Sequence, residues 1–505
     1  QSSIMPLIKK RSEDYKSHFL VNVVYVKGDL ALAEALAEEP GVKSLVHLPE
    51  IPLEDYGLET SAVSSREIVN TWGVDTIGAS RVWSDFEVRG EGAVIGNQDT
   101  GVEWQHVGLV KSYRGNSADS VTKHSYNWYD AIRAPEDTSG LNPNPCGYEV
   151  KAPCDDNNHG THTVGSSVGM VQEYCFGVAP ESKWIACRNM DRGVGTPETY
   201  IDCFEWFLAP TDTAGLNPRP DLAPHVINNS WSCPPSEGCH PDNFFVMELA
   251  VSNLRNSGVV VVVSAGNSGR GGCGTVNRPA AIFDPSFTVG AIQQNDTIAD
   301  FSSIGPVSVD SSGRLKPDLV APGRRVRSSI RGNRFGRFSG TSMAGPHVAG
   351  AVALMVSANP LIAGQVDTIE SILRATADPR KLEGRDCAPF TGKEEVNHIY
   401  GHGRLNAYEA VKQALLYDTS AVTTTERVSL DFSFRIYPNP VTGKLFLDHS
   451  DGWNGAKIAI FDAVGKTVLE QPIVSKLDLK NLPTGIYYLQ VRHSAKNEIF
   501  KIIKL

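Results

Sequence analysis

The sequence predicts an α/β fold, a doubly wound parallel sheet, with a small N-terminal α+β domain and a C-terminal all-β sandwich beside it. The first observation is the alternation of apolar strand patterns with helical patterns, which is typical of doubly wound sheets. The second is Val259–Val263, a run of valines alone. A strand that is apolar on both faces suits a parallel sheet covered by helices on both sides.

The middle region, from about Trp72 to Ala414, supplies this sheet. Besides the valine run, strands are predicted at Ala93–Gly96, Val226–Asn229 and Phe287–Ala291. A helix is predicted at Asn243–Ser257, because this segment is amphipathic at helical spacing and Gly258 follows it as a C-cap.

The N-terminal region is predicted to form a small β-α-β unit. It contains a β-branched strand at His18–Val26, a helix at Asp29–Glu39 and a second strand at Val42–Leu48, with Pro40 and Gly41 ending the helix. The polar segment Glu54–Arg66 follows this unit.

The C-terminal region, from about Thr419, has a different pattern. Short alternating strands separated by turn formers are predicted at Leu445–Leu447, Ile458–Phe461, Ile486–Val491 and Phe500–Leu505. That spacing predicts a small β-sandwich. We therefore expect domains at residues 1–65, 66–418 and 419–505, with the chemistry in the middle one, because the last carries no converging set of His, Cys and carboxylates.

Charge and composition exclude some classes of function. The chain has 47 lysines and arginines against 57 aspartates and glutamates, a formal net charge of −10, so no global basic field attracts nucleic acid. No apolar run approaches the roughly 20 residues of a transmembrane helix. The polar start at Gln1 lacks the pattern of a signal peptide, so either the protein is cytosolic or its signal has been removed.

The cysteines favour export. All nine lie between Cys146 and Cys387. Cys146 and Cys154 bracket one short loop, and Cys233 and Cys239 bracket another, which suits local disulfides formed in an oxidising compartment. Scattered buried thiols are the alternative. Zinc is less favoured, because no paired C-x-x-C spacing occurs.

Three segments of the middle region carry residues suited to nucleophilic catalysis. Asp99 follows a predicted strand, at the sheet edge where α/β proteins bind ligands. His159 opens His-Gly-Thr-His, and Ser342 lies at the start of a buried helix, whose N–H groups and dipole suit a developing oxyanion. Serine needs a neighbouring base, and imidazole needs a carboxylate to hold its tautomer.

Each of these residues alone has an ordinary structural interpretation. An aspartate after a strand is usually a turn residue, and a serine before a helix is usually a cap. His159 and His162 have the spacing of metal ligands, but a third ligand is not apparent. Only the conjunction of Asp99, His159 and Ser342 favours catalysis.

Asp-Thr-Gly at Asp99, His-Gly-Thr-His at His159 and Gly-Thr-Ser-Met-Ala-x-Pro-His-Val-Ala-Gly at Ser342 occur in the order of the subtilisin-like serine peptidases, which the chain resembles over about residues 72–414. Asn97–Gly101 and Trp184–Met190 are similar to the bacillopeptidase F branch. The resemblance implies a serine endopeptidase acting on proteins and peptides through an acyl-enzyme. Ser342 would be its nucleophile, His159 its general base and Asp99 the orienting carboxylate.

The same resemblance implies the residues that contact substrate. Asn267, in Ser-Ala-Gly-Asn, would donate its side-chain amide to the oxyanion. Ser230, Trp231 and Ser232 would form the strand edge that pairs with the substrate main chain. Ser264, Ala265 and Gly266 would form the walls of the pocket, and Asn277 its floor. Neither Asn277 nor Ser268 is acidic, so an uncharged residue is expected at the cleaved position.

No cofactor is expected to be required, and no metal ligand is assigned. Many subtilases carry a calcium-binding aspartate nine residues after the catalytic one, but this chain has Gly108 there, which has no side chain to ligate calcium. A calcium site is therefore possible but unsupported at that position. Asp155 and Asp156, just before His159, either hold a cation or shape the loop, and we favour the loop.

The flanks also resemble known modules. Tyr15–Leu53 is similar to subtilase propeptides, the alternative being a β-α-β decoration. Segments of the C-terminal region resemble the sorting domain of type IX secretion cargo, namely Tyr437–Pro440, Ile460–Asp462, Leu482–Tyr488 and Phe500–Leu505. This implies the type IX machinery as a partner and export across an outer membrane to the surface or the medium. The rival hypothesis is a surface adhesin on an inactive subtilase scaffold, which predicts a broken triad or oxyanion segment.

Overall fold

The computed structural model divides the chain into two compact units, Gln1–Thr419 and Ser420–Leu505. The residues that it describes are 3–12, 14–46, 61–62, 71–116, 122–134, 144–382, 386–388, 391–417, 434–437, 441–449, 453, 455–462, 466–493 and 496–504. The predicted boundary between residues 65 and 66 lies outside these ranges, as does the one between residues 418 and 419.

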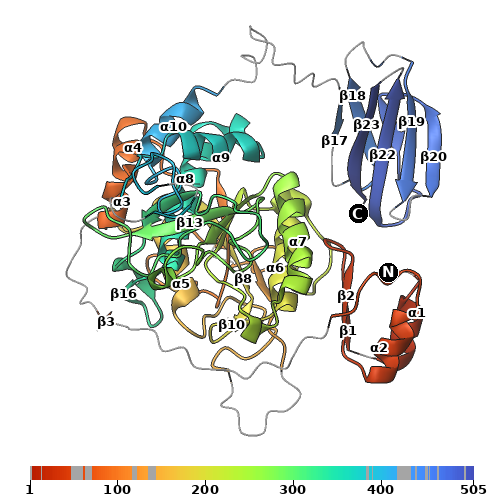
Figure 1. The fold of residues 1–505 in the computed structure, drawn as a ribbon, viewed down its shortest axis with the longest axis horizontal. Coiled ribbons are helices and arrows are strands. Elements are labelled where there is room, and N and C mark those ends of the chain that lie inside the picture. The colour runs from red at the N-terminus through yellow and green to blue at the C-terminus, as the bar shows by residue number, and fades with distance from the viewer. Residues whose placement is uncertain are drawn as a thin grey trace. The chain divides into compact units, whose positions relative to one another are not determined.

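A seven-stranded parallel sheet forms the centre of the first unit (Figure 1). Its strands, in spatial order, are β14 (Leu319–Pro322), β13 (Phe287–Ile292), β12 (Val260–Ser264), β11 (Val226–Asn229), β4 (Val94–Asp99), β8 (Lys183–Arg188) and β5 (Trp128–Asp130). The strand order reverses between β4 and β11, and ligands of such sheets bind at the carboxyl ends of the strands at that point.

Helices cover both faces of this sheet, as predicted. On one side lie α5 (His159–Val168) and α8 (Thr341–Ala358), and on the other α6 (Pro197–Leu208) and α7 (Phe244–Asn256). The valine run divides between them: Val260 and Val262 pack into the core with α8, whereas Val261 and Val263 pack into the core with α6 and α7. The α/β prediction is confirmed, and so is the helix predicted at Asn243–Ser257.

Smaller elements complete this unit. They are α3 (Trp72–Thr76), α4 (Ala79–Asp85), α9 (Val366–Ala375), α10 (Ala407–Leu415), the hairpin of β15 (Val326–Ile330) and β16 (Arg334–Phe338), and the short strands β3 (Ser61–Ala62), β6 (Met170–Val171), β7 (Tyr174–Cys175), β9 (Met190–Asp191) and β10 (Val194–Gly195). Among the described residues, no helix is long and apolar enough to cross a membrane.

The N-terminal residues differ in part from the prediction. They form α1 (Met5–Arg11), β1 (Tyr15–His18), β2 (Val23–Val26) and α2 (Leu30–Ala37), the last capped by Asp29. The single strand predicted at His18–Val26 is wrong, because Leu20 and Val21 lie in the turn of a hairpin and are apolar since they pack into the core around α6 and α7. The strand predicted at Val42–Leu48 is also wrong over residues 42–46, and residues 47 and 48 lie outside the described part.

The second unit contains two antiparallel sheets. One comprises β17 (Phe434–Tyr437), β18 (Lys444–His449) and β21 (Lys476–Asp478), and the other β20 (Thr467–Pro472), β19 (Lys457–Asp462), β22 (Gly485–His493) and β23 (Lys496–Lys504). Apolar residues from both sheets, among them Leu445, Ile458 and Leu489, share one core. All strands predicted here are present, whereas β17, β20 and β21 were not predicted.

Four disulfides link the cysteines. The predicted pairs Cys146–Cys154 and Cys233–Cys239 are confirmed, and Cys187–Cys203 and Cys273–Cys387 are additional. Cys175 is the free and buried cysteine.

Candidate active site

Asp99 and His159 meet at the carboxyl end of β4. The Nδ1 of His159 donates to Asp99 Oδ1 at 2.8 Å, and the aspartate side chain is completely buried. Asp99 also accepts from the Thr100 backbone at 2.7 Å and from the Thr163 hydroxyl at 3.2 Å. Because the carboxylate fixes Nδ1 as the protonated nitrogen, Nε2 is the nitrogen that can act as a base.

This pairing also shifts the pKa of His159. Burial by itself lowers the pKa, but the charge of Asp99, its hydrogen bond and the charge of Asp155 raise it more, so the pKa lies above the ordinary value of 6.5. The imidazole is therefore a stronger base than a free histidine.

Asp155 holds the start of the helix that carries His159. Its Oδ1 accepts from the backbone N–H groups of Asn157 and Asn158 at 2.8 and 3.0 Å, and its Oδ2 accepts from the Thr161 backbone at 3.0 Å. The Thr100 hydroxyl also donates to Asp155, at 2.9 Å. Asp155 thus ties α5 to the residue after Asp99, which is the loop-shaping role that we favoured.

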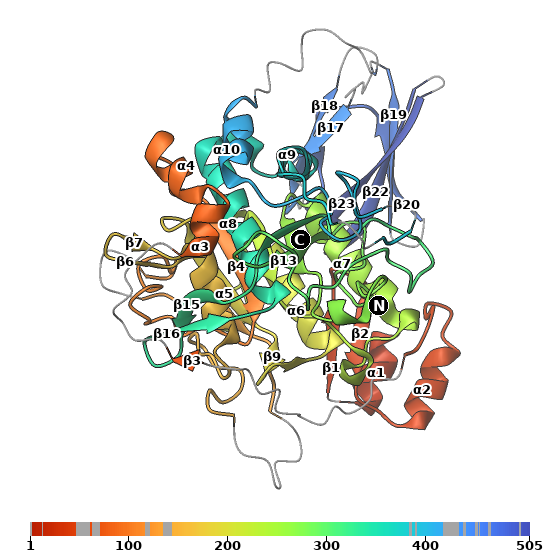
Figure 2. The same ribbon diagram turned by 60° about the vertical axis from the view of Figure 1, so that its left-hand side comes forward.

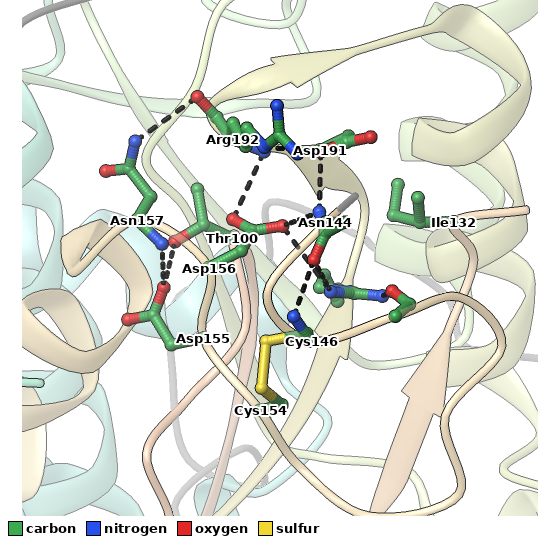
Figure 3. Close-up of polar contacts among 12 residues, drawn as sticks. Thr100, Ile132, Asn144, Cys146, Cys154, Asp155, Asp156, Asn157, Asp191 and Arg192 are labelled. Carbon is green, nitrogen blue, oxygen red and sulfur yellow. Dashed lines mark hydrogen bonds and ion pairs between the residues drawn. A yellow bond between two sulfur atoms is a disulfide. The ribbon is translucent and has the colours of Figure 1, made fainter. Parts of the chain in front are cut away.

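Asp156 lies in a neighbouring buried network with Arg188. Figure 3 shows the Asp156 carboxylate between Asn144 and Arg192. Its carboxylate accepts from Asn144 at 2.8 Å and from the Arg192 backbone at 3.1 Å, while Arg188 makes bidentate bonds to Asp130 at 2.8 and 2.7 Å. Burial raises the pKa of Asp156 to about 7, and the charge of Asp155 adds to this effect. The Cys146–Cys154 disulfide closes a loop next to this network (Figure 3).

Ser342 is the second residue of α8, after Gly340, whose φ of 163° is extended. Pro346 has no N–H with which to bond the Ser342 carbonyl, four residues earlier in the helix. The hydroxyl of Ser230 donates to that carbonyl instead, at 2.9 Å, and the Ser342 hydroxyl donates to the Ser230 carbonyl at 3.0 Å. The helices of Ser342 and His159 pack together, since the Ser167 hydroxyl of α5 donates to the Pro346 carbonyl at 3.2 Å.

Asn267 is oriented by Thr341. Its Oδ1 accepts from the Thr341 backbone at 2.9 Å and from the Thr341 hydroxyl at 3.1 Å. With the oxygen held in this way, the NH₂ end of the exposed amide is the donor available to another group.

Most of the residues expected to bind substrate lie at the carboxyl ends of two neighbouring strands. Ser230, Trp231 and Ser232 follow β11, and Ser264, Ala265 and Gly266 end or follow the neighbouring β12. Trp231 faces inward, since its ring stacks on Tyr200 at 3.8 Å between centroids. Asn277 is exposed, so its place at the floor of a pocket stays a prediction.

Of the histidine pair, His162 is engaged by contacts within the protein. His162 is buried, its ring stacks on Phe338 at 4.4 Å, and its Nε2 donates to the Val326 carbonyl at 3.0 Å. Burial lowers its pKa to about 3. Within the described ranges, no three His, Cys, Asp or Glu residues gather as metal ligands.

The usual calcium-ligand position does not fit a carboxylate. A Cβ placed on Gly108 would lie 2.7 Å from Phe176 Cζ, so the phenyl ring occupies the space that a side chain there would need. These residues therefore do not fit the calcium site that the family implies.

Sequence reasoning did not identify Thr163, Thr341 or Arg188 as parts of the site. Thr163 lies one turn after His159 within the histidine motif, and Thr341 directly precedes Ser342, so both motifs held a usable signal. Arg188 closes the strand β8 next to Asp99 in the sheet, and only the strand register reveals that.

Two families match the chain. The subtilase family matches residues 90–403, and the secretion system C-terminal sorting domain matches residues 435–505.

Relatives with similar sequences include bacillopeptidase F of Bacillus subtilis (strain 168), 33% identical over 416 residues that cover 80% of this chain and 26% of the relative. The thermophilic serine proteinase of Bacillus sp. (strain AK1) is 34% identical over 262 residues, 51% of this chain and 53% of the relative. Subtilisin DY of Bacillus licheniformis is 31% identical over 299 residues, 58% of this chain and 88% of the relative. The chain thus spans about a quarter of the first relative and about half of the second.

Proposed function

Because the chain belongs to the subtilase family, we propose that it is a secreted serine endopeptidase that uses Asp99, His159 and Ser342. The observation that carries this proposal is the 2.8 Å hydrogen bond from His159 Nδ1 to buried Asp99, on a helix that packs against the helix of Ser342. Relatives named as serine proteinases or subtilisins support the same activity.

Catalysis would begin when the Ser342 hydroxyl exchanges its bond to the Ser230 carbonyl for one to His159 Nε2. Ser342 Oγ then attacks the substrate carbonyl while His159 takes the proton, and Asp99 stabilises the imidazolium. The oxyanion is bound by the Asn267 amide and by N–H groups at the start of α8. His159 next gives its proton to the leaving amine, and water hydrolyses the acyl-enzyme by the same steps in reverse order.

Substrate binding would use the edge formed by Ser230, Trp231 and Ser232. An extended peptide that adds to this edge gains main-chain hydrogen bonds whatever its sequence. Around the cleaved position, Ser264, Ala265, Gly266 and Asn277 offer no carboxylate, so uncharged residues are expected there. Comparing kcat/KM for peptides with Phe, Leu, Gln or Arg at that position tests this, and a strong preference for Arg would contradict it.

Residues 1–65, the N-terminal part of the first unit, would act as a propeptide. Lys16 forms an ion pair with Asp202 of α6, and Leu20 bonds through its N–H to Glu205 of α6 at 2.9 Å and through its carbonyl to Asn253 of α7 at 2.6 Å. Contacts to both helices support an assisting role in folding, because they stabilise the packed arrangement of α6 and α7.

The C-terminal sorting domain indicates type IX secretion and export to the cell surface or beyond. The machinery of that pathway is the proposed partner of this domain. Disulfides in the first unit agree with an oxidising compartment.

The alternative, an adhesin on an inactive scaffold, would need a disrupted Asp99, His159 or oxyanion segment. One experiment separates the two functions: casein hydrolysis and fluorophosphonate labelling by the wild type and by Ser342→Ala. The proposed peptidase is labelled at Ser342 alone, and the variant loses about 10⁶ in kcat. A folded wild type that neither hydrolyses casein nor takes the label would favour the adhesin.

A further inference from the structure

Two buried carboxylates share one guanidinium beside the loop that leads to His159. Arg188 ends β8, and its side chain, like that of Asp156, is completely buried. It makes bidentate bonds to Asp130 at 2.8 and 2.7 Å, but its closest approach to Asp156 is 3.4 Å, at Oδ2. Bidentate pairing is the stronger arrangement, so Asp156 is the less compensated of the two negative charges.

The Asp156 carboxylate is bonded by donors on both oxygens. Its Oδ2 accepts from the Asn144 amide at 2.8 Å, and its Oδ1 accepts from the Arg192 N–H at 3.1 Å (Figure 3). The amide of Asn144 has a fixed orientation, because its oxygen accepts from the Cys146 N–H at 2.8 Å. A proton on either oxygen of Asp156 would therefore face an N–H group, and a hydrogen bond to that oxygen would be lost.

The contacts of Asp155 and Asp156 hold the loop that places His159. The body of α5 packs against β4 and β15 (Figure 2), but His159 is its first residue. Asn158, directly before it, has a φ of 101°, a left-handed conformation that persists only where the surroundings determine it. Asp155 bonds the first turn of the helix, and Asp156 ties the same loop to β8 and to the turn after β9. The position of His159 therefore depends on both carboxylates.

Ionisation of Asp156 falls near neutral pH. Burial raises its pKa to about 7, and the charge of Asp155 raises it further, while the bond from Asn144 and the charge of Arg188 lower it. Burial raises the pKa of Asp130 as well. The neutral form of Asp156 therefore predominates below about pH 7. The charged groups of the described residues around it are Asp155 in its own loop, Arg188 on β8, Asp130 on β5, Asp191 and Arg192 at the turn after β9, and Arg331, which donates to the Asp156 carbonyl at 3.0 Å.

From these contacts we propose that Asp156 is a proton-sensitive positioning residue for His159. The ionised carboxylate holds the His159 loop to Arg188 and to the Arg192 backbone. The protonated carboxyl loses one of its hydrogen bonds, and the loop no longer keeps His159 where it can take the proton of Ser342. The proposal rests on the proposed peptidase function, and it adds a second ionisation to the one that His159 itself undergoes.

The acid limb of kcat/KM, measured with a peptide that has no titratable group, tests this. Titration of His159 alone lowers kcat/KM by about tenfold per pH unit, whereas two ionisations lower it by more than about tenfold per unit below pH 7. The wild type should show the steeper limb. Asp156→Asn stays neutral, so it should lower kcat by roughly tenfold at about pH 9 and show the limb of a single ionisation.

Limbs of equal steepness in the wild type and in Asp156→Asn would overturn the proposal, even if the variant were slower at every pH. A wild type that cleaves no peptide at any pH would instead overturn the peptidase function.

Glu370→Gln is the matched control. Glu370 is a buried carboxylate of α9 that shares Arg255 and Arg374, and burial raises its pKa too. This variant should keep the steep limb, and its loss there would contradict the assignment to Asp156. Should Asp156→Asn not fold, Asn144→Ala removes a donor that favours the ionised form, so the steep part of the limb should move to higher pH. An unmoved limb would count against the proposal.

Discussion

Ser230 and Ser342 exchange two hydrogen bonds. The Ser230 hydroxyl donates to the Ser342 carbonyl at 2.9 Å, and the Ser342 hydroxyl donates to the Ser230 carbonyl at 3.0 Å. The first bond replaces a helical one, because Pro346 has no N–H to donate to the Ser342 carbonyl. Ser342, the proposed nucleophile, is thereby attached to the strand edge along which the substrate is expected to bind.

Ser230→Ala should loosen this attachment. The Ser342 carbonyl loses its donor, so the free energy of unfolding should fall by about 1 kcal/mol. Activity should fall with it, since a small displacement of a nucleophile lowers the rate strongly. Thermal unfolding and kcat of Ser230→Ala, compared with Ser230→Thr, which keeps a hydroxyl, measure both effects. If the alanine variant matched the wild type in both, the bond would have no role.

Asn267→Ala should lower kcat by about 10²–10³ with little change in KM, because an oxyanion donor acts mainly in the transition state. Asn267→Asp separates donation from the contact with Thr341, since aspartate keeps an oxygen that can accept from Thr341 but has no amide to donate. It should be at least as slow as the alanine variant. Near-normal turnover by the aspartate variant would remove Asn267 from the oxyanion site.

The pH profile should follow His159. Since its pKa is raised above 6.5, kcat/KM should rise with pH through a value above 6.5 as the imidazole loses its proton. The stabilisation of the protonated imidazole is fully present below pH 6.5 and is lost as the pH rises through the folded pKa. Asp99→Asn removes the largest cause that raises the pKa, so it should lower that pKa and reduce kcat by about 10⁴.

Hydrolysis assays across a pH series measure the pH dependence of kcat/KM. Thermal unfolding of Ser342→Ala, which does not digest itself, measures the pH dependence of stability. An activity pKa at or below 6.5 in the wild type would contradict the assigned environment of His159.

The central sheet was predictable because burial leaves a local signature. Residues of β12 are buried on both faces, and so a valine run indicates the parallel sheet without further information. The hairpin of β1 and β2 was not predictable in the same way. Leu20 and Val21 are apolar because they contact distant helices, and a local pattern does not distinguish such residues from a strand.

The candidate site follows the same rule. Asp99, His159 and Ser342 stand in short motifs and were identified from them. The long-range connections were not: Cys273 and Cys387 are 114 residues apart and bracket no short loop, and Asp155 reaches Thr100 across 55 residues. Such partners are set by strand order and loop packing rather than by neighbouring sequence.

The N-terminal propeptide-like region is expected to be cut from the peptidase domain between about Leu53 and Trp72. Most of this segment lies outside the described residues. Polar segments between compact parts are where cleavage concentrates. N-terminal sequencing of the mature enzyme locates the cut, and Ser342→Ala should remain uncut if the enzyme processes itself. A fully active mature form that still begins at Gln1 would exclude an inhibitory propeptide.

Deleting the chain from about Arg427, a position outside the described residues, should separate hydrolysis from export. The boundary between the two compact units lies between residues 419 and 420. Leu445, Ile458 and Leu489 belong to a core made of residues of the second unit alone. The first unit keeps Asp99, His159, Ser342 and all four disulfides, so the truncated protein should fold and hydrolyse casein at about the wild-type rate. It should nevertheless stay inside the outer membrane, because the sorting domain is missing.

Assays of the medium and of the periplasmic fraction, with Ser342→Ala in the full-length chain as an exported but inactive control, distinguish the two effects. Truncated enzyme in the medium would contradict the sorting role, and a truncated enzyme that is retained but inactive would show that the first unit depends on the second.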